Sequence, residues 1–282
     1  MVILTQMISK EIMPLVSVVV PTYNVERYID ECFQSIFGQT YKNIEVIVVH
    51  TVSPDETYRI LHKYLHRVKL VKTESRLPIS RIRNLGVRQA EGDYIAFCDA
   101  DDCWHPEKIR CQIETHLSNY GVGLTYTDLI RISETGQEIG RLSGHEWNFK
   151  KFLRRRFIAF SSVMVKTKLI KEAGLFDEKI LAEDFDLLIR LSRVTNFKRV
   201  AGFYTYYRIT PGSLSRCLSR PQHHLVVASV FAKHHMTKLR IKCYLRYILV
   251  YFLLTAINHL RRFVPHDIEA RFKKIKIFKP KH

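Results

Sequence analysis

Three carboxylates follow directly on an apolar run near the middle of the chain. Residues 94–98 are Tyr-Ile-Ala-Phe-Cys, and Asp99, Asp101 and Asp102 come next. Carboxylates this close repel one another unless a positive charge lies between them, and Mg²⁺ and Mn²⁺ prefer such oxygen ligands. The ends of strands in an open α/β sheet are also where ligands bind. In a chain with a net charge of +18, this local excess of acid predicts a metal and phosphate site.

The first hundred residues predict the sheet that would position these carboxylates. Short runs rich in valine and isoleucine are typical of strands buried on both faces, and they alternate with segments of helical periodicity. Such alternation predicts a parallel, doubly wound sheet. The strands are expected at 16–20, 44–49, 68–71 and 94–98, and the helices at 25–37, 55–66 and 78–90.

The rhythm changes after Asp102, where longer strands and less regular helices are predicted. Helices are expected at 106–119, 147–156 and 181–194, and strands at 121–132, 161–166 and 197–208. We therefore expect an N-terminal extension at 1–15, one α/β domain at 16–215, and a helical tail at 216–282.

The tail is strongly basic. Residues 219–282 hold 14 Lys and Arg against two acids, Asp267 and Glu269. Residues 238–263 mix cations with an apolar centre, which is typical of a helix that lies in a membrane interface. Alternatively, the apolar part docks on the main domain and only its flanks are solvated. We see no nucleic-acid reader motif, so nucleic acid is not an expected partner.

Targeting signals and cysteine usage indicate a cytoplasmic protein. The first 13 residues lack the features of a secretory signal, and the longest apolar candidate, 247–257, is about half a membrane span. The six cysteines form no Cys-x-x-Cys pair, and the spacing of Cys98, Cys103 and His105 fits no structural zinc pattern. We expect buried thiols, a reducing compartment, and attachment to the inner face of the membrane.

Several motifs occur in order along the chain. They are VSVVVPTYN at 16–24, SIFGQTYKNIEVIVV at 35–49, RNLG at 83–86, GDYIAFCDADD at 92–102, EAGLFD at 172–177, EDFDLLIR at 183–190, and Tyr-Arg at 207–208. With this set, the chain resembles the family 2 glycosyltransferases of the GT-A fold over roughly residues 16–215. The resemblance implies a Rossmann-like, mixed but mostly parallel sheet flanked by helices. It also implies transfer of a sugar from a nucleotide diphosphate donor, with inversion at the anomeric carbon.

For the donor, the resemblance implies a divalent cation, Mn²⁺ or Mg²⁺, held at the Asp99-Ala-Asp101 turn. Asp101 is the first choice as ligand, and Asp99 shares the metal or faces the ribose. Asp102 could instead cap the helix that is expected near residue 106. The residues implied in binding the nucleotide are Pro21, Thr22, Tyr23, Asn24, Arg83 and Asp99.

For the acceptor, the resemblance implies that Asp184 removes the proton of the attacking hydroxyl. Asp186 is the competing candidate, because both carboxylates lie near a helix start. Glu183, Trp104 and Arg208 are the implied contacts to acceptor or diphosphate, although core packing is the more common role of an aromatic residue such as Trp104. A glycan or a lipid-linked precursor is the expected acceptor, as in cell-envelope polysaccharide biosynthesis.

The chain departs from the family pattern in two places. His50-Thr51-Val52-Ser53 stands where the family usually has Asp-Asp-Gly-Ser, and Thr210 stands where a histidine is common. The acid that would read the nucleotide base is therefore missing. A UDP-sugar remains the expected donor with the base left open, and a non-catalytic relative that binds sugar nucleotides or glycans is the alternative.

Overall fold

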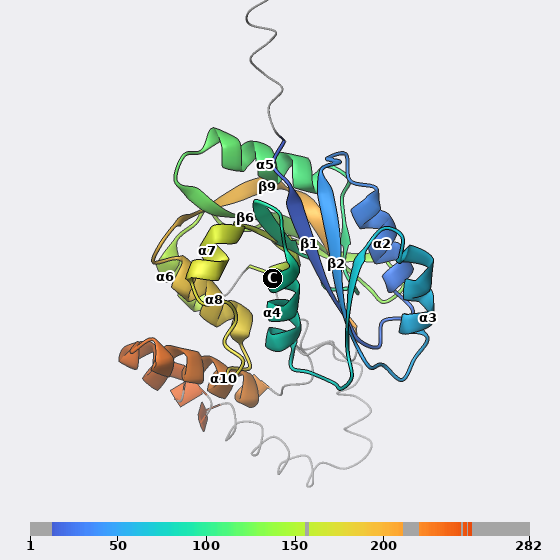
Figure 1. Cartoon of the computed structure of the whole chain (residues 1–282). Coiled ribbons are helices and arrows are strands. Elements are labelled where there is room, and N and C mark those ends of the chain that lie inside the picture. Colours follow the sequence, from blue (N-terminus) through green and yellow to red (C-terminus); the bar gives the residue numbers. More distant parts are fainter. Residues whose placement is uncertain (1–12, 156–157, 211–219, 244, 247, 250–282) are drawn as a thin grey trace, which may run out of the picture. The chain divides into compact units, whose positions relative to one another are not determined.

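The computed structural model describes residues 13–155, 158–210, 220–243, 245–246 and 248–249 (Figure 1). The chain divides into two compact units, Met1–Pro211 and Gly212–His282. The domain boundary that we expected near residue 215 lies outside the described residues.

Four parallel strands form the first half of the sheet, in the order β3-β2-β1-β4. Their bounds are Val16–Thr22 for β1, Ile44–Thr51 for β2, Lys69–Thr73 for β3 and Tyr94–Phe97 for β4. Every residue of β1 is buried, as its continuous run of valines predicts. Strands β1, β2 and β3 are paired up to Thr22, Thr51 and Thr73, so their carboxyl ends meet at one edge.

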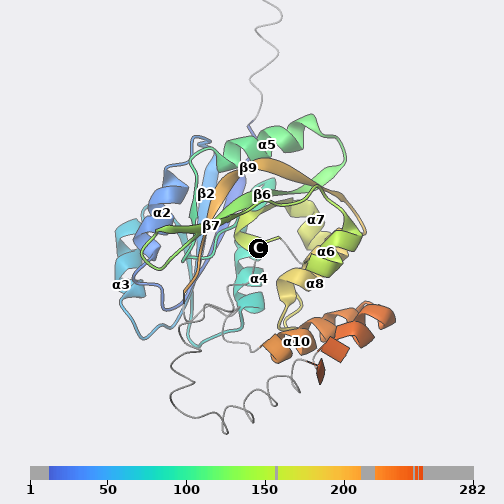
Figure 2. The same ribbon diagram turned by 180° about the vertical axis from the view of Figure 1, so that it is seen from behind.

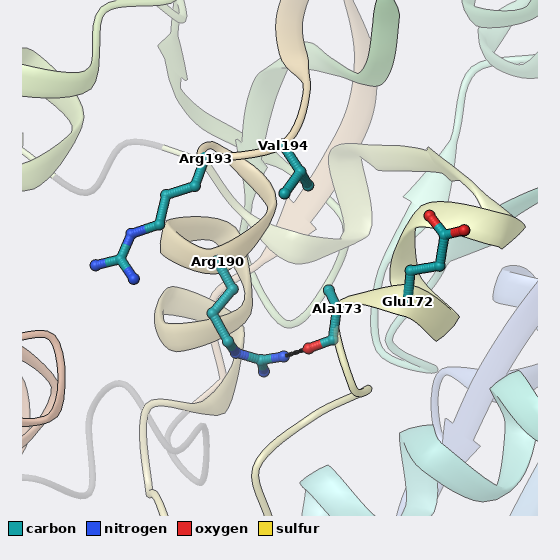
Figure 3. A pocket seen from close by; sticks show the side chains of 5 residues that line it. All are labelled: Glu172, Ala173, Arg190, Arg193 and Val194. Atoms are coloured by element: carbon teal, nitrogen blue, oxygen red, sulfur yellow. Dashed lines mark hydrogen bonds between the residues drawn. The ribbon is translucent and has the colours of Figure 1, made fainter.

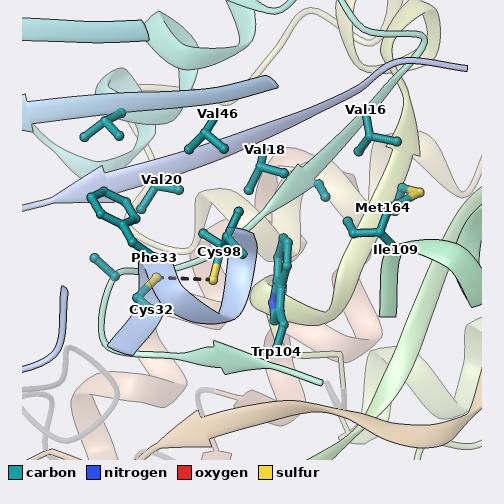
Figure 4. Close-up of a cluster of buried hydrophobic side chains, with 14 of the residues drawn as sticks. Val16, Val18, Val20, Cys32, Phe33, Val46, Cys98, Trp104, Ile109 and Met164 are labelled. Atoms are coloured by element: carbon teal, nitrogen blue, oxygen red, sulfur yellow. Dashed lines mark hydrogen bonds between the residues drawn. The ribbon is translucent and has the colours of Figure 1, made fainter. Parts of the chain in front are cut away.

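The two faces of β1 are covered by different helices, because successive side chains of a strand point to opposite faces. Val16, Val18 and Val20 belong to a core cluster with residues of α2 (Ile29–Phe37) and α5 (Lys108–Ser118), as Figure 4 shows. On the other face, Val19 lies against Gly86 of α4 (Ile79–Gln89). The short helix α3 (Thr57–Leu61) and the 3₁₀ turn His62–Tyr64 connect β2 to β3.

The second half of the sheet mixes strand directions. β8 (Val163–Lys166) pairs antiparallel with β4 and with β6 (Val122–Ile132), and β6 pairs parallel with β9 (Asn196–Arg208). Figure 2 shows β6 and β9 with the edge strand β7 (Glu138–Leu142). Within the described part of the chain, four of the eight strand pairings are parallel, so the sheet is mixed and its parallel part is largely confined to the first half.

The remaining helices are α6 (Phe149–Arg155), α7 (Thr167–Glu172), α8 (Glu183–Leu191) and α10 (Arg220–Lys233), and the 3₁₀ turn Phe160–Ser162 precedes β8. Three short elements were not predicted: β7, α7 and the two-residue strand β5 (Cys103–Trp104). β7 is mostly exposed and lacks the apolar alternation that marks a strand. No helix within the described ranges is long and apolar enough to cross a membrane.

Candidate active site

One arginine joins the two acidic segments that the sequence singles out. Arg83 of α4 donates from Nη2 to Asp99 Oδ1 at 2.8 Å and from Nη1 to Glu183 Oε1 at 2.7 Å. Asp99 lies two residues after the end of β4, and Glu183 is the first residue of α8. The end of β4 and the start of α8 therefore face one another across a single guanidinium.

Arg83 and Glu183 are both buried, and their surroundings shift the pKa of each. Burial opposes the charge of Arg83, but the carboxylates of Asp99 and Glu183 outweigh it and raise the pKa of Arg83. Burial also raises the pKa of Glu183 to about 7, with Asp184 adding to the rise and Arg83 opposing it. The Phe160 ring lies 4.8 Å from the guanidinium carbon, so one flank of the pair is apolar.

The turn after β4 concentrates negative charge. Burial raises the pKa of Asp101 to about 6, and the neighbouring charge of Asp99 contributes to the rise. Asp102 is buried, and its Oδ1 accepts the main-chain N–H of Arg208 at 2.8 Å. The helix-cap interpretation of Asp102 is wrong, because α5 begins after Glu107 and Asp102 bonds to β9 instead.

Arg208 of β9 forms hydrogen bonds with the Asp99–Asp102 turn. Its side chain is almost fully buried, with Nε donating to the Asp101 carbonyl at 2.8 Å and Nη2 donating to Glu31 Oε2 at 2.5 Å. Nη1 donates to the carbonyls of Ser133 and Glu134 in the β6–β7 turn. In this arrangement Arg208 positions the Asp99–Asp102 turn, and a contact with the diphosphate stays a prediction.

Trp104 lies in the core and not at the surface of the site. It is 2% exposed, its indole N–H donates to the Ser161 carbonyl at 2.9 Å, and Lys108 Nζ lies 3.9 Å from the ring centre. The indole nitrogen is satisfied internally, so this placement gives Trp104 a packing role beneath the turn and does not support the expected acceptor contact.

The first turn of α8 separates the two candidate bases. Asp186 is fully buried and accepts from Arg190 Nε at 2.9 Å, and the same arginine donates to the carbonyls of Ala173 and Leu175. Asp184 is half-buried, and its Oδ1 accepts the Phe185 N–H at 2.6 Å. Asp186 therefore has a structural partner within its own helix, which favours Asp184 as the residue that faces a substrate.

Asn84 of the RNLG motif, which sequence reasoning did not single out, links α4 to the segment that precedes α8. Asn84 Nδ2 donates to the Phe176 carbonyl at 3.0 Å, and Asn84 Oδ1 accepts the Phe176 N–H at 2.9 Å. Asn84 Nδ2 also lies 3.0 Å from Glu178 Oε1. The only signal in the sequence was a polar residue beside Arg83 on the buried face of a helix.

The segment expected to hold the nucleoside forms a tight turn after β1. Asn24 has a φ of 53°, and its main-chain N–H donates to Ser53 Oγ at 2.8 Å, which ties this turn to the loop after β2. Pro21 and Thr22 are the last residues of β1, and Thr22 is buried. The guanidinium of Arg76 lies 4.4 Å above the ring of Tyr23.

His50 and Thr51, which replace the family's acids, are both buried. His50 Nδ1 is 3.1 Å from Thr22 Oγ1, and its ring stacks on Tyr58 at 5.4 Å. Burial lowers the pKa of His50, which favours the neutral ring. Thr51 Oγ1 has no hydrogen-bond partner among the residues that the structure describes. His50 and Thr51 are thus two neutral polar side chains at the positions where the family usually has acids.

The donor set at the turn suits a hard divalent cation. Within the described ranges, no group of three or more His, Cys, Asp or Glu side chains is arranged to hold a metal. Asp99 and Asp101 offer two carboxylates, and Mg²⁺ is commonly held by one or two carboxylates together with substrate phosphates. Burial and the neighbouring charge of Asp99 both raise the pKa of Asp101, and a cation bound between these two carboxylates would relieve their repulsion.

A shallow hollow lies elsewhere, between α7 and α8 (Figure 3). Glu172, Ala173, Arg190, Arg193 and Val194 line it. Arg190 is already bonded to Asp186 and Ala173 there. None of the residues singled out for chemistry lines this hollow, so it is separate from the candidate site.

Comparison with known proteins decides the family. The family model described as "Glycosyl transferase family 2" matches residues 17–169, which contain the Asp99–Asp102 turn and Arg83. The chain belongs to glycosyl transferase family 2. It is 31% identical over 207 residues to an uncharacterized glycosyltransferase of Methanocaldococcus jannaschii, covering 70% of this chain and 71% of that protein.

A longer relative is chondroitin synthase of Escherichia coli, which is 27% identical over 265 residues. These cover 91% of this chain but only 37% of that enzyme. The chain also spans only 60% of a related glycosyltransferase of Rickettsia typhi, which is 31% identical.

Solved structures share the GT-A fold. Residues 1–349 of S. aureus TarS, in complex with UDP-GlcNAc, align with a TM-score of 0.64 at 22% identity, covering 83% of this chain and 72% of that one. The mannosyltransferase PcManGT of Pyrobaculum calidifontis, in complex with GDP-Man and Mn²⁺, aligns with a TM-score of 0.64 at 18% identity, covering 96% and 82%. The fold expected for the α/β domain is confirmed, and the basic helical tail stays a prediction.

Proposed function

We propose that this family 2 glycosyltransferase moves a sugar from a nucleotide diphosphate donor to a glycan or lipid-linked acceptor, with metal assistance and inversion. The observation that supports this most directly is the bridge from Asp99 through Arg83 to Glu183. This bridge links Asp99, at the turn proposed to hold the metal and diphosphate, to Glu183, next to the proposed base Asp184. The groups that act on the leaving diphosphate and on the attacking hydroxyl would then lie close together.

In the proposed site, Asp101 and Asp99 hold Mn²⁺ or Mg²⁺. The bound cation would supply charge neutralisation on the diphosphate as it leaves. Arg208 fixes the Asp101 carbonyl, and Asp102 is anchored to β9, so the turn keeps its shape when the donor binds. Pro21, Thr22, Tyr23 and Asn24 are proposed to cradle the nucleoside, and Arg83 to contact its phosphate or base.

Asp184 is proposed to take the proton from the acceptor hydroxyl. A carboxylate can do so from about 3 Å, and Asp184 is half-buried at the start of α8. Glu183 orients the acceptor from beside it, with its own position fixed by Arg83. A single displacement between a leaving diphosphate and a hydroxyl deprotonated on the opposite side inverts the anomeric carbon.

The donor class is supported by the relatives, and the donor base is not assigned by them. TarS is seen with UDP-GlcNAc and PcManGT with GDP-Man. We propose a UDP-sugar, read in part by Thr51, whose buried hydroxyl has no partner within the described residues. We further propose that the enzyme works at the inner face of the membrane in building cell-envelope polysaccharide.

The test is release of nucleotide diphosphate from a panel of UDP-, GDP- and dTDP-sugars, each with Mn²⁺, with Mg²⁺ and with EDTA. We expect turnover with one donor class only when a cation is present. Asp101→Ala should abolish it, and Asp184→Asn should lower it by about 10²–10⁴-fold. Glu114→Gln is the control, because it removes a carboxylate from the exposed face of α5 (side chain 58% exposed) and should leave turnover unchanged.

Loss of activity in both site variants with normal folding would support the proposal. Metal-independent turnover, or turnover that survives Asp101→Ala, would overturn the metal assignment. Tight binding of a sugar nucleotide with no turnover for any donor would instead favour the non-catalytic alternative. The His50-Thr51 departure is the feature of this chain that motivates that alternative.

A further inference from the structure

A helix that follows α10 presents an exposed apolar face. α10 ends at Lys233, and His235, with a φ of 57°, turns the chain while Met236 N–H donates back to the Phe231 carbonyl at 2.8 Å. This left-handed turn closes one helix. The chain is helical again over 237–249 at all residues described there.

Four large aliphatic side chains of this second helix are exposed to solvent. Ile241 is 52% exposed, Leu245 62%, Ile248 46% and Leu249 68%. Their spacing of four, three and one residues places them along a single stripe of an α-helix. Isolated exposed aliphatic residues are common on proteins, but four on one stripe form a contiguous patch.

The stripe is accompanied only by positive charge. Lys238, Lys242 and Arg246 are exposed on the same helix. The sequence has no Asp or Glu anywhere from residue 220 to residue 249. An apolar stripe with cations and no acids is complementary to the interface of an anionic bilayer, where charged headgroups cover the apolar acyl chains.

α10 provides an internal comparison. Its own apolar residues Val227, Ala228, Val230 and Phe231 are at most 2% exposed. The chain therefore buries these four residues of α10 and leaves Ile241, Leu245, Ile248 and Leu249 of the next helix exposed. A nucleic acid would use the cations but not the aliphatic stripe, so lipid accounts for more of this surface.

We propose that helix 237–249 binds the interface of an anionic lipid bilayer, with Ile241, Leu245, Ile248 and Leu249 inserted among the acyl chains. Lys238, Lys242 and Arg246 bind lipid phosphates. Binding is reversible, because four aliphatic side chains bury little apolar area. The inference specifies the membrane attachment in the proposed function, but it does not depend on sugar transfer.

Flotation of the full-length protein with vesicles tests the surface directly. We expect binding to phosphatidylcholine vesicles that contain phosphatidylglycerol, little binding to pure phosphatidylcholine, and weakening as salt is raised. The double variant Leu245→Ser with Leu249→Ser should weaken binding about tenfold or more, because apolar insertion is lost. Lys242→Glu with Arg246→Glu should remove the preference for anionic lipid.

Leu117→Ser is the matched control. Leu117 is 61% exposed on α5, nearly the same as Leu245, but it does not belong to the stripe. It should bind vesicles like the unaltered protein. Circular dichroism melting of each variant checks that folding is unchanged, which is expected for substitutions at exposed positions.

Two results would overturn the proposal. One is vesicle binding that the Leu245 and Leu249 substitutions leave intact. The other is absence of vesicle binding together with a shift of an oligonucleotide that the Lys242 and Arg246 substitutions remove, which would assign the charge to nucleic acid. Neither measurement requires turnover, so failure here is distinct from failure of the proposed reaction.

Discussion

Asp184 and Asp186 are two carboxylates in the same helical turn with different surroundings. Asp186→Asn removes a fully buried charge that pairs with the partly buried Arg190 and should lower the free energy of unfolding by about 3 kcal/mol. Asp184→Asn should leave stability nearly unchanged and lower kcat by about 10²–10⁴-fold, because the acceptor loses its base. Chemical denaturation and donor turnover of both variants check this pair of outcomes.

The reverse pattern would identify Asp186 as the base. Normal stability with lost turnover in Asp186→Asn, and full turnover in Asp184→Asn, would contradict the assignment. Arg190→Lys serves as the structural control. A lysine cannot reproduce the contacts of the guanidinium to both Asp186 and the Leu175 carbonyl, so this variant should be destabilised even though it keeps the positive charge.

Lys108 makes stability depend on pH. Its side chain is fully buried, with Nζ donating to Gln112 Oε1 at 2.8 Å, and burial lowers the pKa of the ammonium to about 7. Between pH 7 and about 10 the unfolded chain therefore binds more protons at this position than the folded one, so the Lys108 contribution to stability rises with pH. Below pH 7 both states are protonated and its penalty is constant.

Lys108→Met should flatten this part of the curve. The difference in unfolding free energy between variant and unaltered protein should be largest below pH 7 and shrink toward pH 9, by up to about 1.4 kcal/mol per pH unit. Urea denaturation at a series of pH values measures it, and the comparison between proteins cancels the titration of tyrosines and thiols. A difference that does not change with pH would show that Lys108 stays charged in the core.

At the scale of elements, Gly86 sets the distance between α4 and the sheet. A Cβ at this position would lie 2.4 Å from Val19 Cγ1, so Gly86→Ala must push α4 away from β1. Overpacking of this kind typically costs about 1–3 kcal/mol. Because Arg83 lies one turn earlier on α4, its bonds to Asp99 and Glu183 should loosen, and donor turnover should fall along with stability.

Arg88→Ala is the control on the same helix, since Arg88 is exposed and the change removes no core contact. Thermal melting and turnover of the two variants separate the effects. If Gly86→Ala melts at a lower temperature but keeps full turnover, the placement of α4 is not what positions Arg83. A double substitution with Val19→Ala should restore part of the lost stability by removing the clash.

Which elements the sequence predicts depends on how strongly their residues mark burial. β1, β2 and β4 were predicted because unbroken apolar runs are hard to place anywhere but inside a parallel sheet. Asp99 and Glu183 were both predicted as residues of the site, but the role of Arg83 in bridging them was not predicted. A predicted strand end or helix start locates a residue within an element. The contacts of its side chain depend on how the elements pack in the folded chain.

The roles of Arg208 and Trp104 were the least predictable. Arginine and tryptophan side chains occur both at protein surfaces and in cores, and the local sequence looks the same in either case. Arg208 has its acceptors in Glu31, the Asp101 carbonyl and the β6–β7 turn, which are far apart in the chain. A buried arginine of this kind becomes recognisable only when three distant segments converge on it.

At the scale of the whole molecule, the net charge of +18 draws anions in, while the Asp99–Asp102 turn repels them locally. A nucleotide diphosphate should therefore bind tightly only when a cation lies between its phosphates and the carboxylates. We predict that UDP or GDP together with Mn²⁺ raises the melting temperature, and that the nucleotide in EDTA does so much less. At a ligand concentration of about 100 Kd, the gain is about 2.7 kcal/mol, or roughly 5–10 °C.

Asp101→Ala should abolish the Mn²⁺-dependent part of the shift without lowering the melting temperature of the free protein, because it removes a carboxylate whose burial is unfavourable. The base giving the larger shift would also identify the donor class, which the buried Thr51 and His50 leave open. Equal shifts with Mn²⁺ and with EDTA would mean that Arg83 or other cations bind the diphosphate. The acids of the turn would then serve the fold, and the net positive charge alone would account for nucleotide binding.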